Sequence, residues 1–133
     1  MKKIYAVYNG SFNYLEDIKI SPLSRAYTFS DSVYEVIPFF NFTAIAYKKH
    51  IHRLQNSCNA LGISINIEAI SSEITSLIKN SRLENGYIYY QISRGIDALR
   101  SHMYEDSLDE ETFGYAVEHN FNSQTLKVSL CED

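Results

Sequence analysis

Two consecutive segments with helical periodicity, flanked by segments with strand periodicity, restrict the fold of this sequence more than any other feature. The first segment begins after Ala46 and ends at Gly62, a residue type that commonly terminates helices. The second follows Asn66, a residue type that caps helix N-termini. Apolar residues recur three or four positions apart in both segments, at Tyr47, Ile51, Leu54, Cys58 and Leu61, then at Ile67, Ile70, Ile74, Leu77 and Ile78. Each helix is therefore expected to bury one face.

Strand-like segments lie before and after the two helices. Residues 4–8 and 12–15 flank Asn9-Gly10, a dipeptide that favours a two-residue hairpin turn. The run SVYEVIPFF (32–40) predicts a strand, and Pro38 inside it predicts an edge position or a bulge. The intervening EDIKISPLSRAY is expected to be irregular. Further strands are predicted in YIYYQIS, with Ile88, Tyr90 and Ile92 on one face, in TFGYAV (112–117) and in TLKVSL (125–130). This order predicts an α+β domain, with two helices on one face of a mainly antiparallel sheet.

Charge and cysteine content exclude several classes of function. The net charge is −4 and no basic stripe covers a face, so nucleic acid is not expected as a main partner. The densest basic run, Lys48-Lys49-His50, is expected to be a solvated helix start. Cys58 and Cys131 have neither disulfide-framework nor zinc spacing, and Cys58 is predicted to be a small buried apolar residue. The apolar run after Lys2-Lys3 is too short for a signal peptide or a membrane span, and we expect a cytoplasmic protein with no membrane partner.

Several residues could bind an anion. Arg100 and His102 lie two positions apart after a strand, and an arginine fork beside an imidazolium suits a carboxylate. The alternative is solvated charge beside the acidic residues that follow them. Arg53 borders the apolar stripe of the first helix, where it could bind an anion, extend into solvent or pair with a carboxylate. A metal site is not expected there, because His50 and His52 have the wrong helical spacing for two ligands.

The segment SRAYTFSDSVYEV gathers aromatic residues around a turn that leads into a strand. Two interpretations remain open for it. One is an Asx-type turn at Asp31 with packing aromatics, and the other is the Tyr27 phenol held at the mouth of a cavity.

Four motifs in order carry a resemblance to a known family: SRAYTFSDSVYEV, then HIHRL within a helix, then GYIYYQISRG, then Arg-x-His. Together they resemble the N-terminal domain of fold-type IV pyridoxal-phosphate enzymes, and most closely the D-amino-acid (D-alanine) aminotransferases. Branched-chain aminotransferases and aminodeoxychorismate lyases share the first two motifs. The likeness extends from about Tyr8 to the end of the chain.

The resemblance implies a role for each matching residue. Arg53 matches the helix arginine that holds the phosphate of pyridoxal 5′-phosphate. Tyr27 matches a tyrosine whose hydroxyl contributes to the substrate carboxylate site, and Arg100 and His102 match the other members of that site. In the family these two reach the active site of the neighbouring subunit, which implies a homodimer. The implied substrates are D-amino acids and 2-oxo acids, as in D-alanine plus 2-oxoglutarate giving pyruvate plus D-glutamate.

The sequence also departs from the family pattern. Serine stands at positions 30 and 32, near which the family usually has glycine, and Phe42 replaces the glycine of an Asn-Gly turn. None of the lysines matches the family's Schiff-base lysine, which lies a short way beyond the strand that here ends in LCED. Residues 1–133 are therefore expected to form the N-terminal domain of a two-domain aminotransferase without the lysine domain, whether as a truncated or an isolated product. No catalytic residue is assigned in this chain, and the chain alone is expected to be inactive. The alternatives are the same domain of a branched-chain aminotransferase or aminodeoxychorismate lyase, or a non-catalytic module for dimerisation or anion binding.

Overall fold

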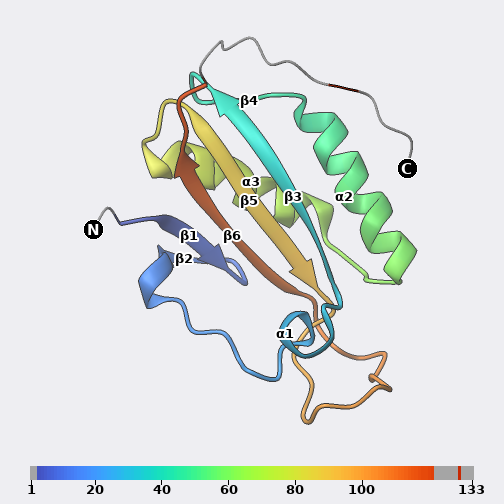
Figure 1. Cartoon of the computed structure of the whole chain (residues 1–133). Helices are drawn as coiled ribbons and strands as arrows, with labels where there is room; N and C mark the ends of the chain where they lie inside the picture. The colour runs from blue at the N-terminus through green and yellow to red at the C-terminus, as the bar shows by residue number, and fades with distance from the viewer. Residues whose placement is uncertain (1–2, 122–128, 130–133) are drawn as a thin grey trace.

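The computed structural model describes residues 3–121 and residue 129, and it is built around one six-stranded sheet (Figure 1). All neighbouring strands are antiparallel, in the order β2-β1-β6-β5-β3-β4. The strands are β1 (Tyr5–Tyr8), β2 (Ser11–Tyr14), β3 (Ser32–Phe40), β4 (Thr43–Ala44), β5 (Gly86–Ser93) and β6 (Glu111–Glu118). The helices are the short η1 (Leu15–Asp17) and α1 (Arg25–Phe29), and the longer α2 (Tyr47–Leu61) and α3 (Ile67–Ser81).

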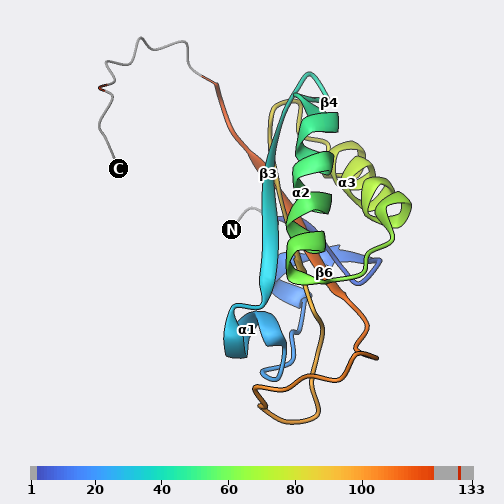
Figure 2. The same ribbon diagram turned by 90° about the vertical axis from the view of Figure 1, so that its right-hand side faces the viewer.

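Helices α2 and α3 cover the same face of the sheet (Figure 2), which confirms the predicted α+β architecture. Gly62 ends α2 in the left-handed region at φ 65°, and the Asn66 side chain caps α3 by accepting a hydrogen bond from the Ala69 amide at 3.1 Å. The caps therefore lie where the sequence predicts them.

The hydrophobic core lies between the two helices and the sheet. Ile88, Tyr90 and Ile92 of β5 are completely buried on the helix-covered face, as their alternation predicts. Cys58 of α2 is also completely buried, and burial raises the pKa of its thiol to about 11. Cys58 is thus a packing residue, whereas Cys131 lies outside the described residues.

The opposite face of the sheet carries a row of aromatic rings from β3, β5 and β6. Tyr34 stacks on Tyr89 with ring centroids 5.5 Å apart, and Tyr89 stacks on Tyr115 at 5.2 Å. Tyr34 remains 63% exposed. The two long helices therefore cover one face of the sheet, and the other face presents aromatic rings toward solvent in the part of the chain that the structure describes.

The sequence-based predictions of individual elements mostly hold. The Asn9-Gly10 hairpin is confirmed, and β3 is an edge strand for most of its length because β4 pairs only with its last two residues, as Pro38 predicts. The segment expected to be irregular contains the last two residues of η1 and the first three of α1, two short helices that its sequence does not predict. The strand predicted over 125–130 falls outside the described residues, apart from Ser129. Among the residues described, no helix is long and apolar enough to cross a membrane.

Two of the three departures from glycine, Ser30 and Phe42, have left-handed backbone geometry, whereas Ser32 is the first residue of β3. Ser30, which ends α1, has φ 54°. Asn41 and Phe42 join β3 to β4 with φ of 48° and 59°, so both central residues of this two-residue turn are left-handed. Phenylalanine carries a steric penalty in this region that glycine does not.

Replacing Phe42 with glycine is expected to raise the free energy of unfolding by about 1 kcal/mol, because the left-handed strain at this turn is removed. Gly10 provides the matched control, since it occupies the equivalent turn position in the β1–β2 hairpin with φ 76°. A Cβ atom there would be 3.7 Å from the nearest side-chain atom, so Gly10→Ala adds strain without a clash and should destabilise. Urea unfolding of both variants measures the two effects, and destabilisation by Phe42→Gly would contradict the interpretation.

Candidate functional site

Arg100 and His102 lie together on the aromatic ring of Phe29. Both belong to the loop between β5 and β6, and both are exposed. The Arg100 guanidinium lies 4.4 Å from the centroid of the Phe29 ring, and the His102 ring meets the same ring edge-on at 5.3 Å. The structure therefore brings the predicted pair together on a ring from α1, a contact that the sequence does not predict.

An ion-pair network connects α1 to the ends of β5 and α2. The Asp31 carboxylate accepts hydrogen bonds from Arg25 Nε at 3.0 Å and from Arg94 Nε at 2.7 Å. Arg94 also donates to the carbonyl oxygens of Leu61, at 2.7 Å, and Gly62, at the C-terminus of α2. Burial opposes ionisation of Asp31, but the two arginines hold its pKa below the ordinary value. Asp31 is therefore an ion-pair acceptor, and this contact is what the Asx-turn interpretation missed.

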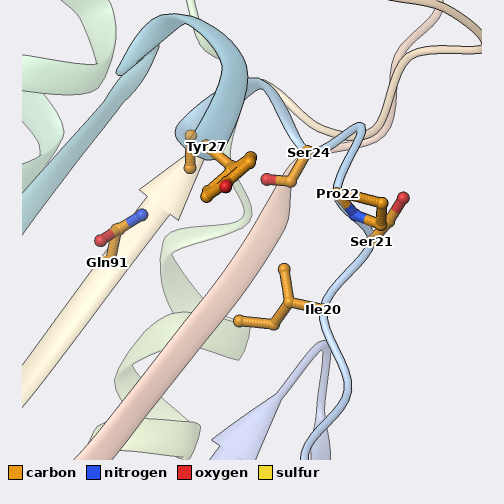
Figure 3. A pocket seen from close by; sticks show the side chains of 7 residues that line it. Ile20, Ser21, Pro22, Ser24, Tyr27 and Gln91 are labelled. Carbon is orange, nitrogen blue, oxygen red and sulfur yellow. The ribbon is translucent and has the colours of Figure 1, made fainter.

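Tyr27 lies at an open cavity of about 460 Å³ that α1 shares with the preceding segment and β5. Figure 3 shows Tyr27 and Gln91 on this cavity, with Ile20 and Ser24 also lining it. The Tyr27 side chain is 80% exposed. The interpretation of Tyr27 as a phenol at a cavity mouth is thus the one that the geometry supports.

Tyr27 is not grouped with Arg100 and His102 within this chain. Residues two positions apart on a helix point to roughly opposite sides, so Tyr27 faces the cavity while Phe29 faces the loop. The resemblance would place Arg100 and His102, as candidate carboxylate ligands, in the active site of a neighbouring subunit. Separation of Tyr27 from the pair within one chain is therefore compatible with that arrangement.

A buried carboxylate fixes the start of α1 to the sheet. Glu111 of β6 is 6% exposed, and it accepts hydrogen bonds from the hydroxyls of Tyr8 at 2.6 Å, Ser93 at 2.8 Å, and Ser24. Burial and the neighbouring carboxylate raise the pKa of Tyr8 to about 12. This cluster cannot be predicted from the sequence, because its four members lie far apart in the chain. The contact of Ser24 with Glu111 places α1 next to the cavity.

Arg53 forms a forked ion pair with a buried carboxylate. Its Nε and Nη2 atoms contact the two Glu35 oxygens at 2.5 and 2.7 Å, and His50 Nδ1 contacts the same carboxylate at 2.8 Å. Glu35 is 3% exposed, whereas the Arg53 side chain is 68% exposed. Burial opposes ionisation of Glu35, but the hydrogen bonds from Arg53 and His50 hold its pKa below the ordinary value. Arg53 is thus an oriented cation that is open to an incoming anion, and it pairs with a carboxylate as one of the sequence-based alternatives predicted.

The ion pair gives Glu35 a pH-dependent effect on stability. Its folded-state pKa lies below the ordinary value of 4.5, so its stabilising effect is present above pH 4.5 and decreases as the pH falls through the folded-state pKa. Glu35→Gln should therefore unfold at a lower urea concentration than the wild type at pH 7, and this difference should shrink below pH 4.5. The exposed Glu84→Gln variant should show no such difference. A difference in urea midpoint between the wild type and Glu35→Gln that stays constant from pH 7 to pH 3 would contradict this role.

Comparisons with known proteins are consistent with the geometry. The family model described as amino-transferase class IV matches residues 32–132. A D-alanine aminotransferase from Staphylococcus epidermidis is 34% identical over 106 residues, which cover 78% of this chain and 36% of that protein. The chain therefore spans about a third of the length of this relative.

Solved structures show the same fold. The branched-chain amino acid aminotransferase from Escherichia coli superposes with a TM-score of 0.80 at 20% identity, covering 89% of this chain and 42% of that one. The 4-amino-4-deoxychorismate lyase from Pseudomonas aeruginosa gives a TM-score of 0.74 at 18% identity, covering 85% of this chain and 39% of that one.

Proposed function

The chain belongs to the class IV aminotransferases, and we propose that it forms the N-terminal domain of a pyridoxal-phosphate-dependent D-amino-acid transaminase. The Schiff-base lysine, in this proposal, belongs to a second domain of the complete protein. The 133-residue chain is then inactive alone. The proposed active form is a cytoplasmic homodimer that uses D-amino acids and 2-oxo acids, with no nucleic-acid or membrane partner.

The observation that carries this proposal is the pairing of Arg100 with His102 on Phe29. A guanidinium fork and an adjacent imidazole supply several donors to the two oxygens of one carboxylate. Both side chains are exposed, so an incoming carboxylate can reach them. Amino acids and 2-oxo acids share this carboxylate, so one pair of side chains can orient the substrates of both half-reactions.

Arg53 fits the cofactor as a ligand of its phosphate. The guanidinium is exposed and its direction is fixed by the buried Glu35, so it can meet a phosphate oxygen without reorganisation. Pyridoxal phosphate, when bound, supplies the electron sink for the charge that develops at the substrate Cα. Arg53 would bind the cofactor phosphate, and Tyr27 would offer its hydroxyl to the substrate carboxylate from the cavity of the same subunit. Arg100 and His102 of the neighbouring subunit would orient that carboxylate.

A second candidate is the corresponding domain of a branched-chain aminotransferase, which the shared fold favours. An aminodeoxychorismate lyase domain, whose fold is also shared, and a non-catalytic dimerisation or anion-binding module are further alternatives. These candidates differ in what they require of Arg100 and Arg53, which the following experiments test in the complete protein.

Replacing Arg53 with alanine in the complete protein is expected to weaken pyridoxal-phosphate binding by roughly tenfold or more, because a charge-assisted contact with the phosphate is lost. Arg53→Lys should retain part of the affinity, since lysine keeps the charge but not the fork. Titration of the cofactor, followed by its visible absorbance, measures the affinity. Arg82→Ala, on an exposed arginine after α3, is the matched control and should bind as the wild type does. Equal affinities for Arg53→Ala and Arg82→Ala would remove Arg53 from the cofactor site.

Replacing Arg100 with alanine should lower kcat/KM for D-alanine by roughly 10- to 100-fold, because the carboxylate loses its forked partner. The same substitution should leave cofactor affinity unchanged, which separates it from Arg53→Ala. Steady-state pyruvate formation from D-alanine and 2-oxoglutarate gives the measurement. Unchanged D-alanine turnover would show that the carboxylate assignment is wrong, and turnover of branched-chain L-amino acids only would favour the second candidate.

A further inference from the structure

Arg25 holds the backbone between the two proposed carboxylate-binding residues. Its Nη1 atom donates a hydrogen bond to the carbonyl oxygen of Ser101 at 2.9 Å, and Ser101 stands between Arg100 and His102. In the part of the chain that the structure describes, this is the one hydrogen bond that joins residues 98–107 to an element of the fold. Those residues have no regular secondary structure and are exposed, so few other contacts restrain them.

Arg25 is itself rigidly held. The side chain is 4% exposed and forms ion pairs with Asp31 at 3.0 Å and Asp97 at 3.2 Å. These bonds leave its guanidinium committed to partners within the chain. Arg25 is therefore suited to hold the loop, and it is not available as a substrate ligand.

Alternating rings and guanidinium groups extend this contact toward Arg100. The Arg25 guanidinium lies 4.5 Å from the centroid of Phe29 and 5.1 Å from that of Tyr104, and Arg94 lies 3.9 Å from Tyr104. Arg100 contacts Phe29 in turn. Arg25 is thus the central member of a stack that runs from Arg94 to Arg100 and connects the end of β5 to the proposed carboxylate site.

We infer that Arg25 is a positioning residue, which sets the Arg100–His102 pair in the geometry that binds the substrate carboxylate. The inference rests on the proposed function. It predicts that loss of Arg25 mobilises the loop and weakens substrate binding, while the cofactor site at Arg53 on α2 is unaffected.

The first experiment measures the loop directly, without any activity. Limited trypsin digestion of the complete protein cleaves after Arg100 faster when the loop is more mobile, because the protease must bind an extended segment, so the cleavage rate reports how firmly the loop is held. Arg25→Met should raise the rate of cleavage after Arg100 by about tenfold. Arg82→Met, the same substitution at an exposed arginine away from the loop, should leave the rate unchanged. Equal rates in wild type and Arg25→Met would overturn the anchoring role.

The second experiment measures substrate binding. Arg25→Met should raise the KM for D-alanine by about tenfold with a smaller change in kcat, and cofactor affinity should stay at the wild-type value. Arg25→Lys keeps the charge but cannot reach three partners at once, so its KM for D-alanine should lie between those of the wild type and Arg25→Met. Cys58→Ala serves as a control for general destabilisation, because it removes part of a completely buried core side chain that contacts neither Arg100 nor His102 in the ring and ion-pair contacts above, and it should leave KM unchanged.

The two experiments separate failure of this inference from failure of the proposed function. A wild-type protein that turns over D-alanine, with the same KM in Arg25→Met, overturns the positioning role alone. A wild-type protein with cofactor but no D-amino-acid turnover overturns the proposed function, and with it the carboxylate role of the positioned pair. Faster cleavage together with raised KM in Arg25→Met supports the inference.

Discussion

The ion pairs of Asp31 are the interaction on which the geometry of this domain most depends. One carboxylate binds Arg25 at the start of α1 and Arg94 at the end of β5, and Arg94 also binds the last carbonyls of α2. Because unpaired charges at such partly buried positions are costly, the three charged groups stabilise one another and favour this packing of α1, β5 and α2. Arg25, which this carboxylate binds, donates a hydrogen bond to Ser101 and so positions the loop that carries Arg100 and His102.

Glu111 complements this network from the opposite side of α1. Its carboxylate accepts hydrogen bonds from the hydroxyls of Tyr8, Ser24 and Ser93. Because Ser24 precedes α1 and Ser93 ends β5, this carboxylate holds the start of α1 beside the end of β5. A short helix of five residues has little stability of its own, since helix nucleation is unfavourable. Its orientation, with Tyr27 on the cavity and Phe29 under the loop, is therefore imposed by Glu111 on one side and Asp31 on the other.

The two proposed binding regions differ in how they are supported. Arg53 extends from a regular helix, and one ion pair with a buried carboxylate on the adjacent strand orients its side chain. Arg100 and His102 lie on a loop and depend on side-chain contacts from α1 and β5. In the proposed function, an arginine held by an ion pair would bind the one cofactor and a more adjustable loop would bind two different substrates.

The sequence by itself determined the two amphipathic helices and their caps, the Asn9-Gly10 hairpin, and the buried face of β5. These features depend on periodicity and on local backbone preferences, which a single segment contains. It also identified Arg53, Arg100 and His102 as candidates by residue type. Only the tertiary structure decided that Glu35 pairs with Arg53, because these residues are 18 positions apart. The same holds for the contacts of Phe29 with Arg100 and His102, 71 and 73 positions away, and for the hydrogen bond from Arg25 to Ser101, 76 positions away. No local pattern encodes such pairings, since they form only when the sheet and α2 bring those segments together.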